Sequence, residues 1–430
     1  MDPTTRRNAL RAGALAVVAG FAGCAGDDTS ETPTDTTSRV PSTADPTTTH
    51  DTPTLQRHAV WSDDLGGEIG LEPAIADGTL YIGRRDGHLA ALDPTTGTEK
   101  WTTTAGIGFA GFDDASPTTA DGLVYVVPGA TQGVAGRGFE VVALDVATGD
   151  ERWSHSVDET SFLSLLGVHD GRVLAATSDD VVGNMDETLV ALDATSGRVE
   201  WTGTVGNPSG WGIGAGGVYV SSFAALRAVA LTDGDTRWTT SRRTVDGVDV
   251  TAQTVVTSLE RDRGARLRGL DPVSGDTTWR GPDWTVTSHA TRDGTVYAGG
   301  EQLGAYDADT GAERWSIRGH GFVAEPPIDG RLFARLESGI HARDPDSGKL
   351  RWGTNATHDS PLTFGDGFLA YVAASDDPAV PPTLVVRDTA TGDATLAVTF
   401  DDADALAPPV AHGETLIVAT RDGRVHAIRP

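Results

Sequence analysis

Most tryptophans of this chain recur at one position of a repeated segment, which is described below. Trp211 and Trp284 do not belong to that segment, and they are the first candidates for binding chemistry. Each precedes a predicted second strand, so either ring could face a central channel and stack on a planar cofactor or a sugar. An indole combines a large apolar face with one N–H donor, which suits packing as well as stacking. Packing between neighbouring sheets is the commoner use, so we interpret both as packing residues first and stacking candidates second.

Carboxylates offer a second kind of chemistry, the binding of a metal or a polar ligand. Glu72 and Glu325 stand just before prolines of predicted inner strands and could point toward a channel mouth, although solvated rim charges are the commoner outcome. The Asp-x-Asp pairs at 307–309 and 344–346 resemble the opening of a calcium loop, but they lack its sixth-position Gly and its later Glu. Because they coincide with a repeated turn, we expect turn chemistry there and no metal.

Other reactive groups are sparse. The 11 histidines form no His-x-His pair and no His-Glu-x-x-His run, so a zinc site is not expected. The chain has no Gly-x-Ser-x-Gly elbow and no phosphate loop. Its single cysteine, Cys24, excludes an intrachain disulfide and a cysteine metal cluster.

A repeated segment of about 40 residues determines the elements that position these side chains. Its most regular part reads LAALDPTTGTEKW from Leu89 to Trp101, and Leu396 replaces the tryptophan in the eighth copy. A residue that recurs at one phase of every repeat holds the repeats together, so we assign the repeated tryptophans to structure and not to a binding stripe. They are Trp101, Trp153, Trp201, Trp238, Trp279, Trp315 and Trp352.

Each repeated segment predicts a β-hairpin. Asp93 can accept hydrogen bonds from the backbone two residues ahead, and Gly97 supplies the positive φ that closes a tight turn. Three apolar runs precede the Asp in each unit, so every unit has four short strands. Four-stranded antiparallel sheets in radial array predict an all-β fold, a closed β-propeller.

The chain ends predict how the ring closes. The last unit stops after Arg424–Ile428 without an outer strand, and an orphan strand, His58–Trp61, stands at the other end. Pairing the strand of Trp61 with the C-terminal sheet would remove both open edges. This arrangement gives nine units.

The charge balance limits the partners. There are 61 acidic residues against 33 Lys and Arg, a formal net charge of -28, which argues against binding to nucleic acid or to anionic membranes. Lysine occurs only at Lys100 and Lys349, and this acid-rich, lysine-poor composition resembles that of proteins from salt-loving archaea.

The first residues predict export. Arg6 and Arg7 form a twin-arginine pair, and an apolar stretch then ends in a lipobox-like Phe-Ala-Gly-Cys at Cys24. We expect a signal region over 1–24 with Cys24 lipidated, a disordered Thr/Asp/Pro-rich linker over 25–55 and the propeller over 56–430. Asn355 begins an Asn-Ala-Thr sequon, a glycosylation candidate that suits an exported chain.

The repeat resembles the tryptophan-docking repeat of PQQ-type propellers across residues 57–430. One branch of that family comprises quinoprotein alcohol dehydrogenases, and the other comprises BamB-like, lipid-anchored, non-enzymatic scaffolds. The enzyme branch implies a quinone held by a Trp and two adjacent cysteines, with a Ca²⁺ nearby, and this chain has only Cys24. Both branches usually have eight blades, one fewer than the units counted here.

The resemblance favours an exported, lipid-anchored, non-catalytic scaffold at the cell surface. It would bind proteins, with no cofactor and no nucleic acid, and would contact the membrane only through its anchor. The alternatives are a PQQ-dependent dehydrogenase and a propeller that binds a sugar or small molecule through Trp211 or Trp284.

Overall fold

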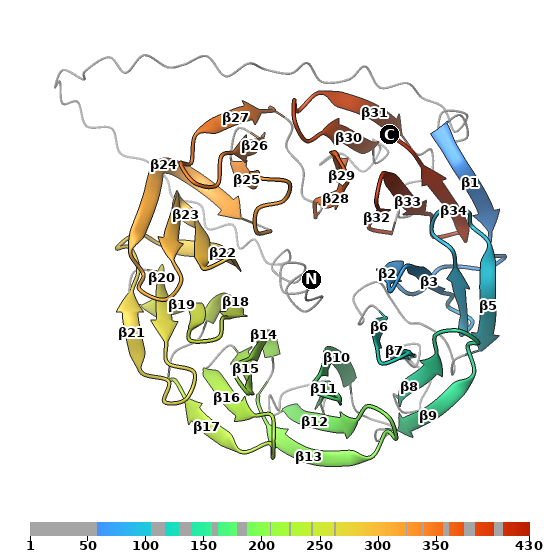
Figure 1. Cartoon of the computed structure of the whole chain (residues 1–430), viewed down its shortest axis with the longest axis horizontal. Coiled ribbons are helices and arrows are strands. Elements are labelled where there is room, and N and C mark those ends of the chain that lie inside the picture. The colour runs from blue at the N-terminus through green and yellow to red at the C-terminus, as the bar shows by residue number, and fades with distance from the viewer. Residues whose placement is uncertain are drawn as a thin grey trace, which may run out of the picture.

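The fold is a closed β-propeller, a ring of antiparallel β-sheets (Figure 1). The computed structural model describes residues 58–104, 117–128, 140–156, 162–178, 187–206, 208–222, 225–241, 244–261, 264–323, 325–336, 339–355, 361–373, 383–399 and 407–430. In Figure 1, every unit runs from an inner strand near the centre outward to a strand at the rim, as the repeat predicts. We number the units 1 to 9 along the chain.

Units 1 to 5 each form a separate four-stranded sheet. Their strands, inner to outer, are β2 (Ala74–Ala76), β3 (Thr79–Gly83), β4 (His88–Leu92) and β5 (Glu99–Thr104) in unit 1; β6 (Thr118–Ala120), β7 (Leu123–Val126), β8 (Glu140–Asp145) and β9 (Glu151–Ser156) in unit 2; β10 (Phe162–His169), β11 (Arg172–Ser178), β12 (Glu187–Asp193) and β13 (Val199–Thr204) in unit 3; β14 (Pro208–Gly214), β15 (Gly217–Ser222), β16 (Leu226–Ala230) and β17 (Thr236–Thr239) in unit 4; and β18 (Thr244–Val250), β19 (Val255–Arg261), β20 (Gly264–Leu270) and β21 (Thr277–Arg280) in unit 5.

Units 6 and 7 share one six-stranded sheet, and units 8 and 9 are again four-stranded. The strands are β22 (Val286–Arg292), β23 (Thr295–Asp307), β24 (Glu313–Val323), β25 (Leu332–Leu336), β26 (Gly339–Arg343) and β27 (Leu350–Gly353) in the shared sheet; β28 (Thr363–Gly365), β29 (Phe368–Ala373), β30 (Thr383–Asp388) and β31 (Ala394–Thr399) in unit 8; and β32 (Val410–His412), β33 (Thr415–Ala419) and β34 (Arg424–Ile428) with β1 (Ala59–Asp64) in unit 9.

The shared sheet arises because β24 serves two units. Its first part pairs with β23 as the outer strand of unit 6, and its last residues, 321–323, pair with β25 as the inner strand of unit 7. β23 folds back on itself, since the amide of Ala308 bonds the carbonyl of Gly294 at 3.0 Å and so joins its two ends. The nine units of the sequence therefore occupy eight hydrogen-bonded sheets.

Closure by the N-terminal strand is confirmed. β1 pairs antiparallel with β34, with Ala59 opposite Ile428 and Asp64 opposite Arg424. The strand extends to Asp64, three residues beyond the predicted end. The outer strand of the last sheet thus comes from the opposite end of the chain.

The apolar core is divided among the joints between units. One buried cluster, for example, combines Tyr81 and Trp101 of unit 1 with Val124 and Val126 of unit 2. Nine such clusters follow one another around the ring, so each sheet is stabilised mainly by its two neighbours.

Candidate functional site

The repeated tryptophans dock onto the repeated glycines of the next unit. Trp101, only 7% exposed, donates its indole N–H to the carbonyl of Val146 at 2.8 Å. A Cβ on Gly149 would lie 2.6 Å from the same ring, so this glycine supplies space for the indole as well as the positive φ of 75°. This joint geometry supports the structural role predicted for the repeated tryptophans.

The same hydrogen bond recurs at eight joints. The indole N–H groups of Trp61, Trp101, Trp153, Trp201, Trp238, Trp279, Trp315 and Trp352 donate respectively to the carbonyls of Pro94, Val146, Ala194, Leu231, Pro272, Ala308, Pro345 and Thr389.

A tyrosine on the second strand reinforces several docks. The hydroxyl of Tyr125 and the indole of Trp153 both donate to the carbonyl of Ala194, each at 3.0 Å, and the two rings lie 5.8 Å apart. Burial raises the pKa of Tyr125 from 10.0 to about 12, so the hydroxyl keeps its proton to a higher pH than an exposed tyrosine does. Sequence reasoning missed these tyrosines, although a Tyr at the same place in Tyr81, Tyr125, Tyr219 and Tyr297 was the available signal.

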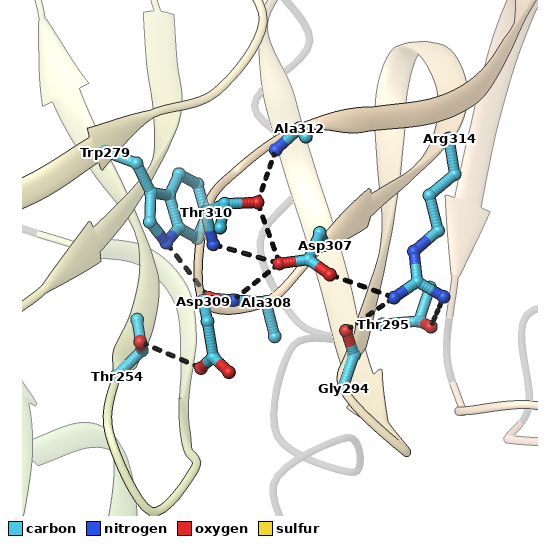
Figure 2. A network of polar contacts seen from close by, with 10 residues as sticks. All are labelled: Thr254, Trp279, Gly294, Thr295, Asp307, Ala308, Asp309, Thr310, Ala312 and Arg314. Atoms are coloured by element: carbon cyan, nitrogen blue, oxygen red, sulfur yellow. Dashed lines mark hydrogen bonds and ion pairs between the residues drawn. The ribbon is translucent and has the colours of Figure 1, made fainter.

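Figure 2 shows how Asp307, the Asp of the turn in unit 6, is hydrogen-bonded. One carboxylate oxygen of Asp307 accepts the amide of Thr310 at 3.0 Å and its hydroxyl at 2.8 Å. The other accepts from Arg314 at 3.1 Å. The Thr310 side-chain bond, then the Arg314 bond, lower the pKa of Asp307 below its ordinary value. The turn carboxylate is therefore ionised and hydrogen-bonded inside its own unit.

These contacts show the Asp-x-Asp stretch at 307–309 in turn chemistry. Asp309 accepts a hydrogen bond from Thr254 of unit 5 at 3.3 Å, so its carboxylate spans the joint (Figure 2). In the stretch at 344–346, Asp344 likewise accepts the amide of Ser347 at 3.0 Å. Within the described ranges, no group of three or more His, Cys, Asp and Glu side chains is placed to hold a metal ion.

The two stacking candidates are covered by protein. Trp211 on β14 is 7% exposed, and its N–H donates to the carbonyl of Leu166 on β10 at 3.0 Å. Trp284 is 8% exposed and packs with Trp279 and Tyr306 between units 5 and 6. Little of either ring faces solvent, so their placement matches the packing interpretation better than stacking.

The other candidate residues are dispersed around the wheel. Glu72 precedes β2 in unit 1 and Glu325 follows β24 in unit 7, and both are half-buried. Asn355 is exposed just after β27, while the sequon threonine lies outside the described residues. Neither glutamate belongs to a metal-binding group among the residues that the structure describes.

An ionic clasp at the closure escaped sequence reasoning. One carboxylate oxygen of Glu68 lies 3.2 Å from Arg85 of unit 1 and 3.3 Å from Arg421 of unit 9. The amide of Ile69 also bonds the carbonyl of Arg421 at 2.9 Å. The segment between β1 and β2 thereby ties the first unit to the last. The predicted pairing of the two chain ends brings these segments near each other, but no sequence pattern specifies the ion pairs themselves.

A buried polar pair joins the inner strands of units 5 and 6. His289 Nε2 on β22 lies 3.9 Å from a carboxylate oxygen of Asp249 on β18, and the histidine side chain is 1% exposed. Sequence reasoning missed this pair as well, because neither residue belongs to the repeated part of its unit. The placement indicates a contact between neighbouring inner strands.

The export candidates Arg6, Arg7 and Cys24 and the linker at 25–55 lie outside the described residues. Among the residues that are described, no helix is long and apolar enough to cross a membrane.

Comparison with known proteins identifies the family of this chain. A family model described as "Outer membrane protein assembly factor BamB" matches residues 54–279, 263–339 and 336–429. The protein of that name from Burkholderia pseudomallei is 25% identical over 407 residues, which cover 88% of this chain and 89% of the relative.

Solved structures are similar at lower identity. BamB from Moraxella catarrhalis is 16% identical, with 86% of this chain and 97% of that one covered at a TM-score of 0.49. Quinohemoprotein alcohol dehydrogenase from Comamonas testosteroni is 14% identical, with 86% and 76% covered at a TM-score of 0.47.

Proposed function

Because this chain belongs to the family of outer membrane protein assembly factor BamB, we propose that it is a non-catalytic scaffold that binds other proteins at the outer face of the cell membrane. The observation that carries the proposal is the use of the repeated side chains. The repeated Trp residues make contacts between units and the repeated Asp residues make contacts within turns, as Trp101 and Asp307 show. A rigid ring of this kind leaves recognition to the variable connections between strands.

Binding is tested by crosslinking in intact cells at high salt, followed by mass spectrometry of the purified chain. We expect the same few proteins in every replicate, absent from an unrelated anchored protein used as the control. A set of crosslinked proteins that does not differ from the set found with the control would contradict the proposed scaffold function.

Export and anchoring are part of the proposal and rest on Arg6, Arg7 and Cys24. Mass spectrometry of the mature N-terminus should find a lipid on Cys24, and Cys24→Ser should move the protein from the membrane to the medium. Replacing Arg6 and Arg7 together by Lys should leave the precursor inside the cell. A Cys24→Ser protein that stays on the membrane would contradict the anchor. The acidic, lysine-poor composition leads us to propose in addition that the cell lives in a strongly saline medium.

The absence of catalysis is tested with purified protein, PQQ and Ca²⁺. We expect no dye-linked oxidation of alcohols or sugars and no quinone retained after gel filtration. Turnover that disappears when PQQ is omitted would replace the scaffold by the dehydrogenase alternative. Retention of a sugar in the same assay, lost in Trp211→Phe or Trp284→Phe, would favour a carbohydrate-binding propeller instead.

A further inference from the structure

The joint between units 8 and 9 is built differently from the other eight. The chain has 10 tryptophans; eight dock across joints and the other two are Trp211 and Trp284, so none remains for this joint. Leu396 takes the docking position and packs with Leu416, Val418 and Ile428 of unit 9. A leucine fills this space without an N–H donor.

The missing dock has a structural cause. In the other joints, the indole lies on the Asp-x-x-Thr-Gly type of turn that links the third and outer strands of the next unit. In unit 9 no such turn links the third strand to the outer strand, because the third strand is β34 and the outer strand is β1, from the first part of the described fold. There the amide of Arg429 bonds the carbonyl of His58 at 3.2 Å. A tryptophan at position 396 would therefore have neither the glycine nor the turn carbonyl to dock on.

The opposite side of unit 9 is held more firmly. Trp61 of β1 docks on unit 1 at Pro94, and the segment that links the two units bonds back to unit 9 through the amide of Leu65 and the carbonyl of Gly423 at 3.0 Å. Glu68 adds the ionic clasp to Arg421. Between units 8 and 9, two polar contacts join residues that the structure describes: the hydroxyl of Thr363 donates to the carbonyl of Pro409 and the amide of Asp366 to that of Gly413, each at 2.8 Å.

We infer that the wheel has one built-in opening point, the joint between units 8 and 9, and that unit 9 stays on unit 1 when this joint opens. Local openings follow the weakest cooperative contacts of a fold. Opening at this joint leaves the hydrogen bonds within each sheet intact and exposes the apolar faces around Leu396 and Val418. The inference goes beyond the proposed function and does not depend on it.

Thiol labelling of the full chain tests the inference, with Cys24→Ser as background so that each introduced cysteine is the only thiol. Val418→Cys reports on the joint between units 8 and 9, and Val126→Cys is its counterpart between units 1 and 2; both valines are fully buried. Ile417→Cys, on the other face of β33, reports on the joint between units 9 and 1. We expect the thiol at 418 to react at least about tenfold faster than the other two under native conditions.

Equal rates at 418 and 126 would overturn the inference. Equally fast labelling at 418 and 417 would also overturn it, because it would show that unit 9 unfolds or leaves unit 1. Adding Trp101→Leu to the Val126→Cys variant should bring the labelling rate at 126 close to that at 418. If labelling at 126 stays slow in the folded variant, the indole of Trp101 does not keep the joint between units 1 and 2 closed. If Trp101→Leu does not fold, the comparison of 418, 126 and 417 decides.

Discussion

The six-membered ring of Trp61 lies against Gly97, and a Cβ on that glycine would be 2.6 Å from the indole. Trp61 belongs to the first strand of the described fold and Gly97 to the outer turn of unit 1, so this contact holds the closing strand to the start of the ring. The glycine is thus required twice, for its positive φ of 73° and for the space above it.

Gly97→Ala and Gly78→Ala separate these two requirements. Gly78 has a similar φ of 67°, and a Cβ added there would meet nothing within 4 Å, so its substitution should cost about 1–2 kcal/mol of unfolding free energy through backbone strain alone. Gly97→Ala should cost about 1–3 kcal/mol more, because the methyl group overpacks against the indole of Trp61. Urea denaturation of both variants measures the difference, and equal losses would show that the ring moves away freely.

Trp101→Phe should cost about 1–3 kcal/mol, because the carbonyl of Val146 loses the indole donor that bonds it at 2.8 Å. Tyr125→Phe is the matched control. The carbonyl of Ala194 keeps its bond from Trp153 at 3.0 Å, so this change should cost less than about 1 kcal/mol. Chemical denaturation compares the two, and a Tyr125→Phe loss as large as that of Trp101→Phe would contradict the assignment of the indole as the main donor.

Leu396→Trp should not stabilise the protein, although it restores the repeat. With no turn in unit 9 to receive the ring, we expect a loss of about 1–3 kcal/mol from overpacking. Trp352→Leu, at the preceding joint, should be destabilising as well, because Thr389 loses its donor at 2.8 Å. A higher midpoint of denaturation for Leu396→Trp would show that unit 9 offers a dock after all.

Acid should weaken the turns. Hydrogen bonds from turn amides and side chains lower the pKa of Asp93, and those from Thr310 and Arg314 lower that of Asp307, below the ordinary value of 3.8. The unfolded chain then binds these protons at a higher pH than the folded one. The stabilisation is therefore present above pH 3.8 and is lost as the pH falls through the lower folded values. Asp307→Asn should flatten this part of the curve of stability against pH; an unchanged slope would contradict it.

His341 should add a separate dependence at higher pH. Burial, and then the positive charge of Arg343, lower the pKa of His341 from 6.5 to about 4. Between these values the unfolded chain binds a proton that the folded chain does not, so stability should fall as the pH drops from 6.5 toward 4. His341→Gln removes the titrating group and should reduce that slope. An NMR titration in which the imidazole protonates near pH 6.5 would refute the shift.

Much of the fold could be predicted from the repeat. In each repeated segment a Gly stands four residues before an aromatic residue, and this spacing predicts a β-hairpin. Because the segment recurs along the chain, it predicts a ring of units that is closed by the two chain ends. These features depend on local turn geometry and on strand count, which neighbouring residues determine. The degenerate copy at Leu396 was visible as well, but its reason was not, because the reason is the absence of a turn in a different unit.

The repeating hairpins, the docking role of the tryptophans and the closing strand of Trp61 follow from the order of the residues alone. Whatever depends on contact between distant residues required the folded ring. Folding buried Trp211 and Trp284, brought Glu68 between Arg85 and Arg421, and joined units 6 and 7 through β24. Burial and ion pairing arise only when units meet, and sequence periodicity describes one unit at a time.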